Sequence, residues 1–136
     1  VVTLAEDLRD RTRVYGAIDT LENLKKGGRI GNAQALLGSM LSIKPLIDIS
    51  TGVVEEAGRQ RTRRKSLVWL RDKVVEQVDQ IDTLSVMHAQ ADDVDDLVTM
   101  LADVVDPSII QVGVIGPVVA SHGGPGLIGL CFTLRP

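Results

Sequence analysis

Apolar positions recur along the chain at two spacings, which together predict a mixture of helices and strands. Steps of three and four residues are typical of a helix with one buried face. Leu67, Leu70 and Val74 follow that spacing in the longest such segment, and Thr62 can cap its start. We predict helices over 3–12, where Thr3 and Glu6 form a capping box, and over 21–26, 32–41, 62–78 and 91–105.

Short apolar runs without the helical spacing predict strands. These runs cover residues 14–19, 45–49, 53–60, 82–89, 108–116 and 127–134. A turn at 50–52 joins the second and third runs as a β-hairpin, and the last two runs are expected to pair as closing strands. This order favours an α/β fold, a two-layer sheet-and-helix sandwich with a mixed sheet, over a doubly wound parallel sheet.

The composition is typical of one globular domain. The chain has 136 residues, of which 44% are hydrophobic and 24% are charged, enough apolar material for a core. Tyr15, Trp69 and Phe132 are the only aromatic residues, so we expect an aliphatic core and no base-stacking surface. A formal net charge of −3 gives nucleic-acid binding no overall support. No apolar run reaches the ~18 residues of a membrane-spanning helix.

The single cysteine, Cys131, lies in an apolar run and is interpreted as a small buried hydrophobic residue. One cysteine allows no internal disulfide, which favours a reducing compartment such as the cytoplasm. The chain begins Val-Val-Thr without an initiator Met and shows no signal peptide, which suggests a fragment or a processed chain.

A glycine-rich segment, "LKKGGRIGNAQ" over 24–34, surrounds Arg29 with three glycines. Glycine lets the backbone approach a ligand, and the planar guanidinium suits carboxylates or phosphates. The spacing is not that of a Walker A motif, and the segment does not directly follow a strand. A helix end followed by a solvated arginine therefore stays open as the alternative.

A basic segment, "GRQRTRRKS" over 58–66, carries five basic residues. Cations at a helix N-terminus oppose the helix dipole, so the cluster has a local cost. Three interpretations stay open: a solvated helix start, a surface for an acidic partner, and a stand-alone regulatory or nucleic-acid-binding domain that uses 59–65.

His122 lies in "ASHGGPGLIG", a stretch rich in glycine and proline. A metal site needs three or four ligands, whereas His88 is interpreted as structural and Cys131 as buried. Ser121 is adjacent, but neighbouring side chains on an extended segment point apart, so a hydrolase lacks a credible nucleophile. His122 is left either as a turn residue or as a hydrogen-bond donor to an anion.

Three blocks of the sequence resemble the C-terminal half of the DegV family of bacterial fatty-acid-binding proteins. They are "TLENLKKGGRIGNAQALLGSMLSIKPLI" (20–47), "GRQRTRRKSL" (58–67) and "SHGGPGLIG" (121–129). The resemblance spans nearly the whole chain, in the right order. One departure is "GPVVASHGG", because family members often run directly from a Gly-Thr stretch into the histidine loop.

The resemblance implies that residues 1–136 form a C-terminal lipid-binding domain, and that the N-terminal α/β domain of the family is absent from this chain. It implies a long-chain fatty acid as ligand, with no cofactor and no metal. The partner it implies is the catalytic subunit of a fatty acid kinase, which converts the bound acid to an acyl phosphate for lipid synthesis. The chain itself is then a cytoplasmic substrate-binding subunit and not an enzyme. Nucleic acid is not an expected partner, whereas transient contact with a membrane surface is compatible with this role.

The resemblance also implies site residues. His122 and Arg29 are expected to bind the fatty-acid carboxylate, while Gly123, Gly124 and Gly126 let the loop close around it. Arg61 and Arg63 are expected to dock the kinase. An aliphatic lining suits an alkyl chain, and the candidate lining residues are Leu36, Leu37, Met40, Leu41, Ile43 and Leu127.

Overall fold

A computed structural model gives the backbone of residues 1–136, and it describes the side chains of residues 1–37 and 43–136. Its strands are β1 (Thr12–Ala17), β2 (Lys44–Asp48), β3 (Glu55–Gln60), β4 (Ile81–His88), β5 (Ile110–Val114) and β6 (Ile128–Leu134). They form one six-stranded sheet in the order β3-β2-β1-β6-β4-β5. Strand β5 is parallel to β4 and the other neighbours are antiparallel, which confirms the predicted mixed α/β fold.

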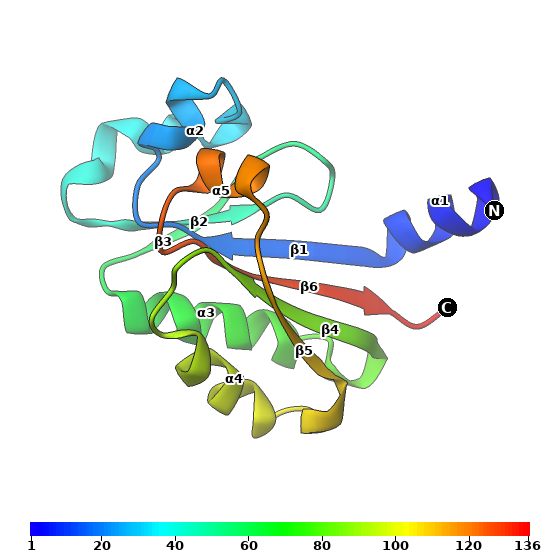
Figure 1. Ribbon diagram of the computed structural model, residues 1–136. Coiled ribbons are helices and arrows are strands. Elements are labelled where there is room, and N and C mark those ends of the chain that lie inside the picture. Colours follow the sequence, from blue (N-terminus) through cyan, green and yellow to red (C-terminus); the bar gives the residue numbers. More distant parts are fainter.

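The helices are distributed unequally over the two faces of the sheet. They are α1 (Val2–Arg11), α2 (Glu22–Lys26), α3 (Arg63–Val75), α4 (Val94–Ala102) and α5 (Pro117–Gly123), with 3-10 segments η1 (Gly31–Ser42), η2 (Val78–Gln80) and η3 (Pro107–Ile109). Helices α3 and α4 lie along one face, whereas α2 and α5 lie at one end of the other (Figure 1). Much of that second face is therefore not covered by a helix.

The main core lies between the sheet and the α3–α4 layer. Strand β6 shows how the sequence builds it, because its residues alternate between the two faces. Leu130 and Phe132 point into the core and are at most 1% exposed, while Gly129 and Cys131 face the other way and are half-buried. Tyr15 packs against Phe132 and Trp69, so the three aromatic residues gather in this core.

A second, smaller core fixes the end of the sheet where α2 and η1 lie. It contains Ile18, Leu21, Leu24, Ala33, Leu36, Ile47, Ala89 and Leu127, each at most 7% exposed. These side chains anchor the segments on either side of Arg29 and His122. The second core thus holds the part of the molecule that carries both candidate ligand groups.

Several predicted boundaries differ from the observed ones. The predicted helices over 62–78 and 91–105 are shorter, Arg63–Val75 and Val94–Ala102. Thr62 caps α3 as predicted, since its hydroxyl accepts a hydrogen bond from the Lys65 amide at 3.2 Å. The predicted capping box of Thr3 and Glu6 is wrong, because Val1 holds the cap position of α1 and no side chain bonds there.

Two predictions about the C-terminal region are wrong. The closing strands are not a pair: β4 lies between β5 and β6. The segment before His122 is the helix α5 and not an extended stretch. Its signals were Pro117 at the first helical turn and Gly124, with φ of 81°, just past the end.

Candidate functional site

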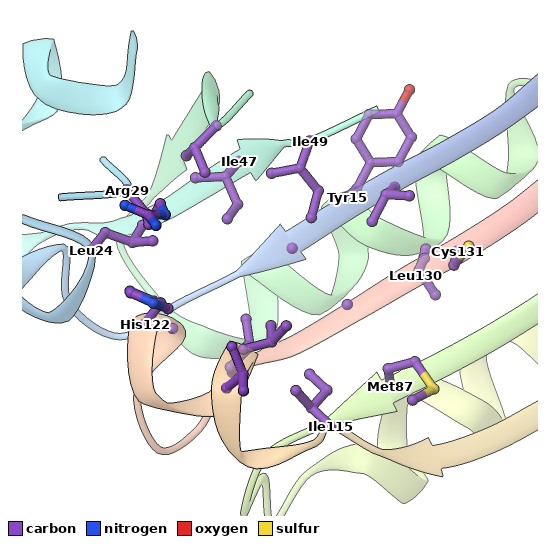
Figure 2. Close-up of a pocket in the computed structure, with 18 of the residues that line it drawn as sticks. Tyr15, Leu24, Arg29, Ile47, Ile49, Met87, Ile115, His122, Leu130 and Cys131 are labelled. Atoms are coloured by element: carbon purple, nitrogen blue, oxygen red, sulfur yellow. The ribbon is translucent and has the colours of Figure 1, made fainter. Parts of the chain in front are cut away.

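An apolar cavity of about 550 Å³ opens on the face of the sheet away from α3 and α4. Its walls come from β1, β2, β4 and β6, from α2 and α5, and from the segments that flank them (Figure 2). The aliphatic residues and the one methionine that line it are Val14, Leu24, Ile47, Ile49, Val54, Met87, Ile115, Val118, Val119, Leu127 and Leu130. Such a cavity can bind a flexible alkyl chain but offers few polar partners along most of its length.

Two glycines form the floor of the cavity. Gly16 on β1 and Gly129 on β6 are register partners, and both line it. The same row across the sheet continues to Ile47 on one side and to Met87 on the other. Because neither glycine has a side chain, the cavity reaches down to the backbone of the sheet at this point.

His122 lies at one end of the cavity, in the last turn of α5. Its Nδ1 is buried and has no hydrogen-bond partner among the residues that the structure describes. A buried polar atom without a partner costs about 1–3 kcal/mol. A buried polar atom of this kind needs a partner, which a water molecule or a ligand atom can supply.

Arg29 lines the same end of the cavity as His122 (Figure 2). Its guanidinium is exposed and donates a long hydrogen bond, 3.4 Å, to the carbonyl of Gly27. Gly27 also adjoins the histidine, since a Cβ added there would overlap the His122 imidazole. The cavity is therefore basic at this end, with Met87 and Cys131 toward the other.

Gly27 contributes to the site in a way that the sequence does not predict, because the glycines around Arg29 suggest either a close approach of the backbone to a ligand or the end of a helix. Its φ of −81° is open to any residue, so backbone freedom does not require glycine here. Its lack of a side chain makes the room that the imidazole occupies. Nothing in the local sequence pairs position 27 with position 122.

The three glycines predicted to shape the histidine loop are placed differently from one another. Gly123 is buried and lines the cavity. Gly124 and Gly126, with φ of 81° and 87°, form the turn behind it and do not line it. A Cβ at Gly126 would lie 2.5 Å from the Asp19 carboxylate, so the turn packs closely against the Asp19 side chain.

Only one of the described residues predicted to line an alkyl chain, Leu127, lines this cavity. Leu36 is fully buried in the second core, and Leu37 and Ile43 pack at its edge. Met40 and Leu41 lie outside the described side chains. The lining that was missed comes from strand positions facing away from the main core, and from Val118 and Val119 on the unpredicted helix α5.

The two arginines predicted to dock a partner occupy different environments. Arg61 is exposed between β3 and α3. Arg63 is turned inward: its Nε and one terminal nitrogen bond both carboxylate oxygens of Asp93, at 2.7 and 3.0 Å. The same nitrogen donates to the carbonyl of Gly126 at 2.6 Å. Position 63 therefore contributes less free charge to the surface of the basic segment than the sequence suggested.

The remaining candidate groups show no hydrolytic or metal arrangement in the described part of the chain. Ser121 Oγ donates to the carbonyl of Pro117 at 2.7 Å, within its own helix. Cys131, predicted to be fully buried, is half-buried and lines the cavity, and burial raises the pKa of its thiol. No described cluster of three or more His, Cys, Asp or Glu side chains could hold a metal ion. None of the described helices is both long and apolar enough to cross a membrane.

Comparisons with known proteins agree on one family. Residues 1–135 match the family described as "Uncharacterised protein, DegV family". A DegV domain-containing protein of Streptomyces coelicolor is 35% identical over 98% of this chain and 49% of its own length. This chain thus spans about half the length of the curated relatives it matches.

Solved structures show the same fold. The fatty acid binding DegV family protein of Streptococcus agalactiae superposes with a TM-score of 0.89 at 27% identity, over 99% of this chain and 49% of that one. A structure described as fatty acid binding of a DegV family protein, from Thermus thermophilus, gives 0.83 at 32% identity, over 98% and 49%. Both are similar to this chain over nearly its entire length.

Proposed function

The chain belongs to the DegV family, and from that premise we propose that its cavity binds the alkyl chain of a long-chain fatty acid. In this proposal His122 and Arg29 bind the carboxylate at the basic end. The observation that carries it is the buried and unpartnered Nδ1 of His122, a residue that lines one end of an aliphatic cavity together with Arg29. Two similar structures are described as fatty acid binding, which supports the same ligand class.

The chemistry of a fatty acid matches the two ends of the cavity. Each methylene group that leaves water contributes about 0.8 kcal/mol, and the walls offer aliphatic partners along the floor of Gly16 and Gly129. A carboxylate that leaves water must find hydrogen-bond donors, or its burial costs several kcal/mol. The imidazole can donate one bond, and the Arg29 guanidinium supplies a charge that favours the ionised acid.

We also propose that this chain is the C-terminal part of a larger binding protein, whose remainder closes the cavity. The curated relatives are about twice as long as the chain, and one face of the sheet here is covered only at one end. In the same proposal the protein acts in the cytoplasm and presents the carboxylate to a fatty acid kinase. The exposed Arg61 is the docking residue, and the kinase performs the phosphoryl transfer.

Mass spectrometry of the full-length gene product tests the lipid proposal. We expect denatured protein to release long-chain acyl species, and the stripped protein to bind added palmitate. His122→Ala should weaken palmitate binding about tenfold, whereas Ser121→Ala, which changes the exposed neighbour on the same helix, should leave it unchanged. Absence of both co-purified acyl species and palmitate binding would contradict the proposal.

A further inference from the structure

Arg63 joins the basic segment to the turn that follows His122. It lies at the start of α3, and its guanidinium reaches two distant parts of the chain. Its bonds to Asp93 connect it to the segment before α4, and its bond to the Gly126 carbonyl connects it to the turn after α5. A further contact of 3.4 Å runs to the carboxylate of Asp19. Arg63 is not among the residues that line the cavity.

The turn that Arg63 holds is fixed to the site by backbone hydrogen bonds. The Gly126 amide donates to the carbonyl of Ala89 at 2.8 Å, and the Gly124 amide donates to that of Ala120, in α5, also at 2.8 Å. The next residue after Gly126, Leu127, is buried and lines the cavity. A displacement of the Gly126 carbonyl would therefore reach both α5 and the cavity wall within a few residues.

The hydrogen bonds around Arg63 hold its guanidinium in one orientation. The Arg63 and Asp93 side chains are only 24% and 21% exposed, so their bidentate pair is partly shielded from water. The bond from Arg63 also holds the pKa of the Asp93 carboxyl below its usual value. The Asp19 carboxylate would lie 2.5 Å from a Cβ on Gly126 and also pairs with Lys44 at 3.6 Å. The carboxylates of Asp93 and Asp19 thus bond the guanidinium on two sides, and the terminal nitrogen that bonds Asp93 also donates to the Gly126 carbonyl.

We propose that Arg63 is a positioning residue that keeps the Gly124–Leu127 turn, and with it the end of α5 carrying His122, in the geometry that a bound carboxylate needs. The binding part of this inference rests on the proposed function. The structural part, that Arg63 orders the turn, does not. Arg63, which does not line the cavity, then affects the ligand site through its bond to the Gly126 carbonyl.

Substitution of Arg63 in the full-length gene product tests both parts. Arg63→Gln should speed hydrogen exchange of the Gly126 and Leu127 amides in the ligand-free protein about tenfold. It should also weaken palmitate binding about tenfold and move the imidazole NMR signals of His122. Arg63→Lys should restore only part of each effect, because an ammonium cannot bond Asp93 and Gly126 as the fork does. Arg71→Gln, which removes a pair with the adjacent Asp72 on the same helix, is the matched control and should change none of them.

A charge swap separates positioning from stability. In the double variant Arg63→Asp with Asp93→Arg the ion pair can form again, but no donor at position 63 reaches Gly126. We expect the free energy of unfolding to recover relative to Arg63→Asp, while fast amide exchange and weak palmitate binding persist. Full recovery of palmitate affinity in the swap, or unchanged exchange and affinity in Arg63→Gln, would overturn the inference. If the unsubstituted protein binds no palmitate, the proposed function fails, and the exchange measurements still decide whether Arg63 orders the turn.

Discussion

The two faces of the sheet use the same strands for different purposes. On the face under α3 and α4, Leu84, Leu130 and Phe132 are at most 1% exposed and fill the space with side chains. On the opposite face, Gly16 and Gly129 leave the backbone bare beneath a cavity of about 550 Å³. The neighbouring residues Phe132 and Cys131 therefore belong to a packed core and to a cavity wall, respectively.

Stability and binding therefore depend on alternate residues of the same strands. Side chains that face the α3–α4 layer contribute to folding through close packing, where lost volume is costly. Residues that face the cavity leave room for a ligand, so substitutions there should change binding more than folding. Substitutions on the two faces test this distinction.

The largest effect is expected from Phe132→Ala on the packed face. Phe132 is fully buried and lies beside Tyr15, with ring centroids 6.1 Å apart. Truncation should lower the free energy of unfolding by about 3–5 kcal/mol, as measured by urea denaturation. Thr133→Ala, a change at the next residue on the opposite face, is the control and should cost far less. Equal losses for the two variants would contradict the distinction between the faces.

The two floor glycines should respond differently to alanine. A Cβ at Gly129 would lie 2.7 Å from the backbone carbonyl oxygen of Tyr15, which cannot move without shifting the strand. Gly129→Ala should therefore lower the free energy of unfolding by about 1–3 kcal/mol. At Gly16 the nearest atom is the side-chain Cγ1 of Ile47 at 3.3 Å, and that side chain can adjust. Gly16→Ala should leave the free energy of unfolding nearly unchanged but weaken palmitate binding. A larger loss of stability in Gly16→Ala than in Gly129→Ala, measured by urea denaturation, would contradict this description of the cavity floor.

Gly27→Ala should affect binding with little effect on folding. The added methyl group would occupy the position of the His122 imidazole and force the ring to move. We expect palmitate to bind about tenfold more weakly, which corresponds to ~1.4 kcal/mol, in a calorimetric titration. Gly28→Ala is not a suitable control, because φ is +67° at Gly28. Lys26→Ala, an exposed change one residue earlier, serves instead and should bind normally.

The smallest effect is a change in the pH dependence of stability. The bond from Arg63 lowers the pKa of Asp93 from its ordinary value of 3.8. The ionised form is therefore favoured in the folded state, and its contribution is present above pH ~3.8 and lost as the pH falls through the lowered pKa. Asp93→Asn should cost less than about 1 kcal/mol at pH 7 and should flatten the acid side of the stability profile. An unaltered acid profile would mean that Asp93 gains nothing from Arg63.

The sequence predicted most of the fold, because local pattern determines most of it. Alternation along β6 and the three-to-four spacing in α3 identify the residues that face the main core. Helix α5 was not predicted, because seven residues are too few to form a stable helix alone and its valines favour a strand. The order β1-β6-β4-β5 depends on contacts between distant strands, which no local pattern specifies.

The candidate site was predictable in its chemistry but not in its arrangement. His122 and Arg29 stood out as rare or charged residues among glycines, and both line the cavity. Leu36, in contrast, had the correct polarity for a lining residue but is enclosed by the second core. The inward turn of Arg63 depends on Asp93 and Gly126, which lie 30 and 63 positions away in the sequence. Sequence spacing cannot show which arginine of a basic segment meets such partners.

The most direct measurement of the central claim is a crystal structure of the full-length gene product with bound palmitate. We predict that a carboxylate oxygen lies within hydrogen-bond distance of the His122 imidazole, near the Arg29 guanidinium. The alkyl chain should cross the floor formed by Gly16 and Gly129 and continue toward Met87 and Cys131. A palmitate bound elsewhere, or one in this cavity with its carboxylate at the Cys131 end, would contradict the account.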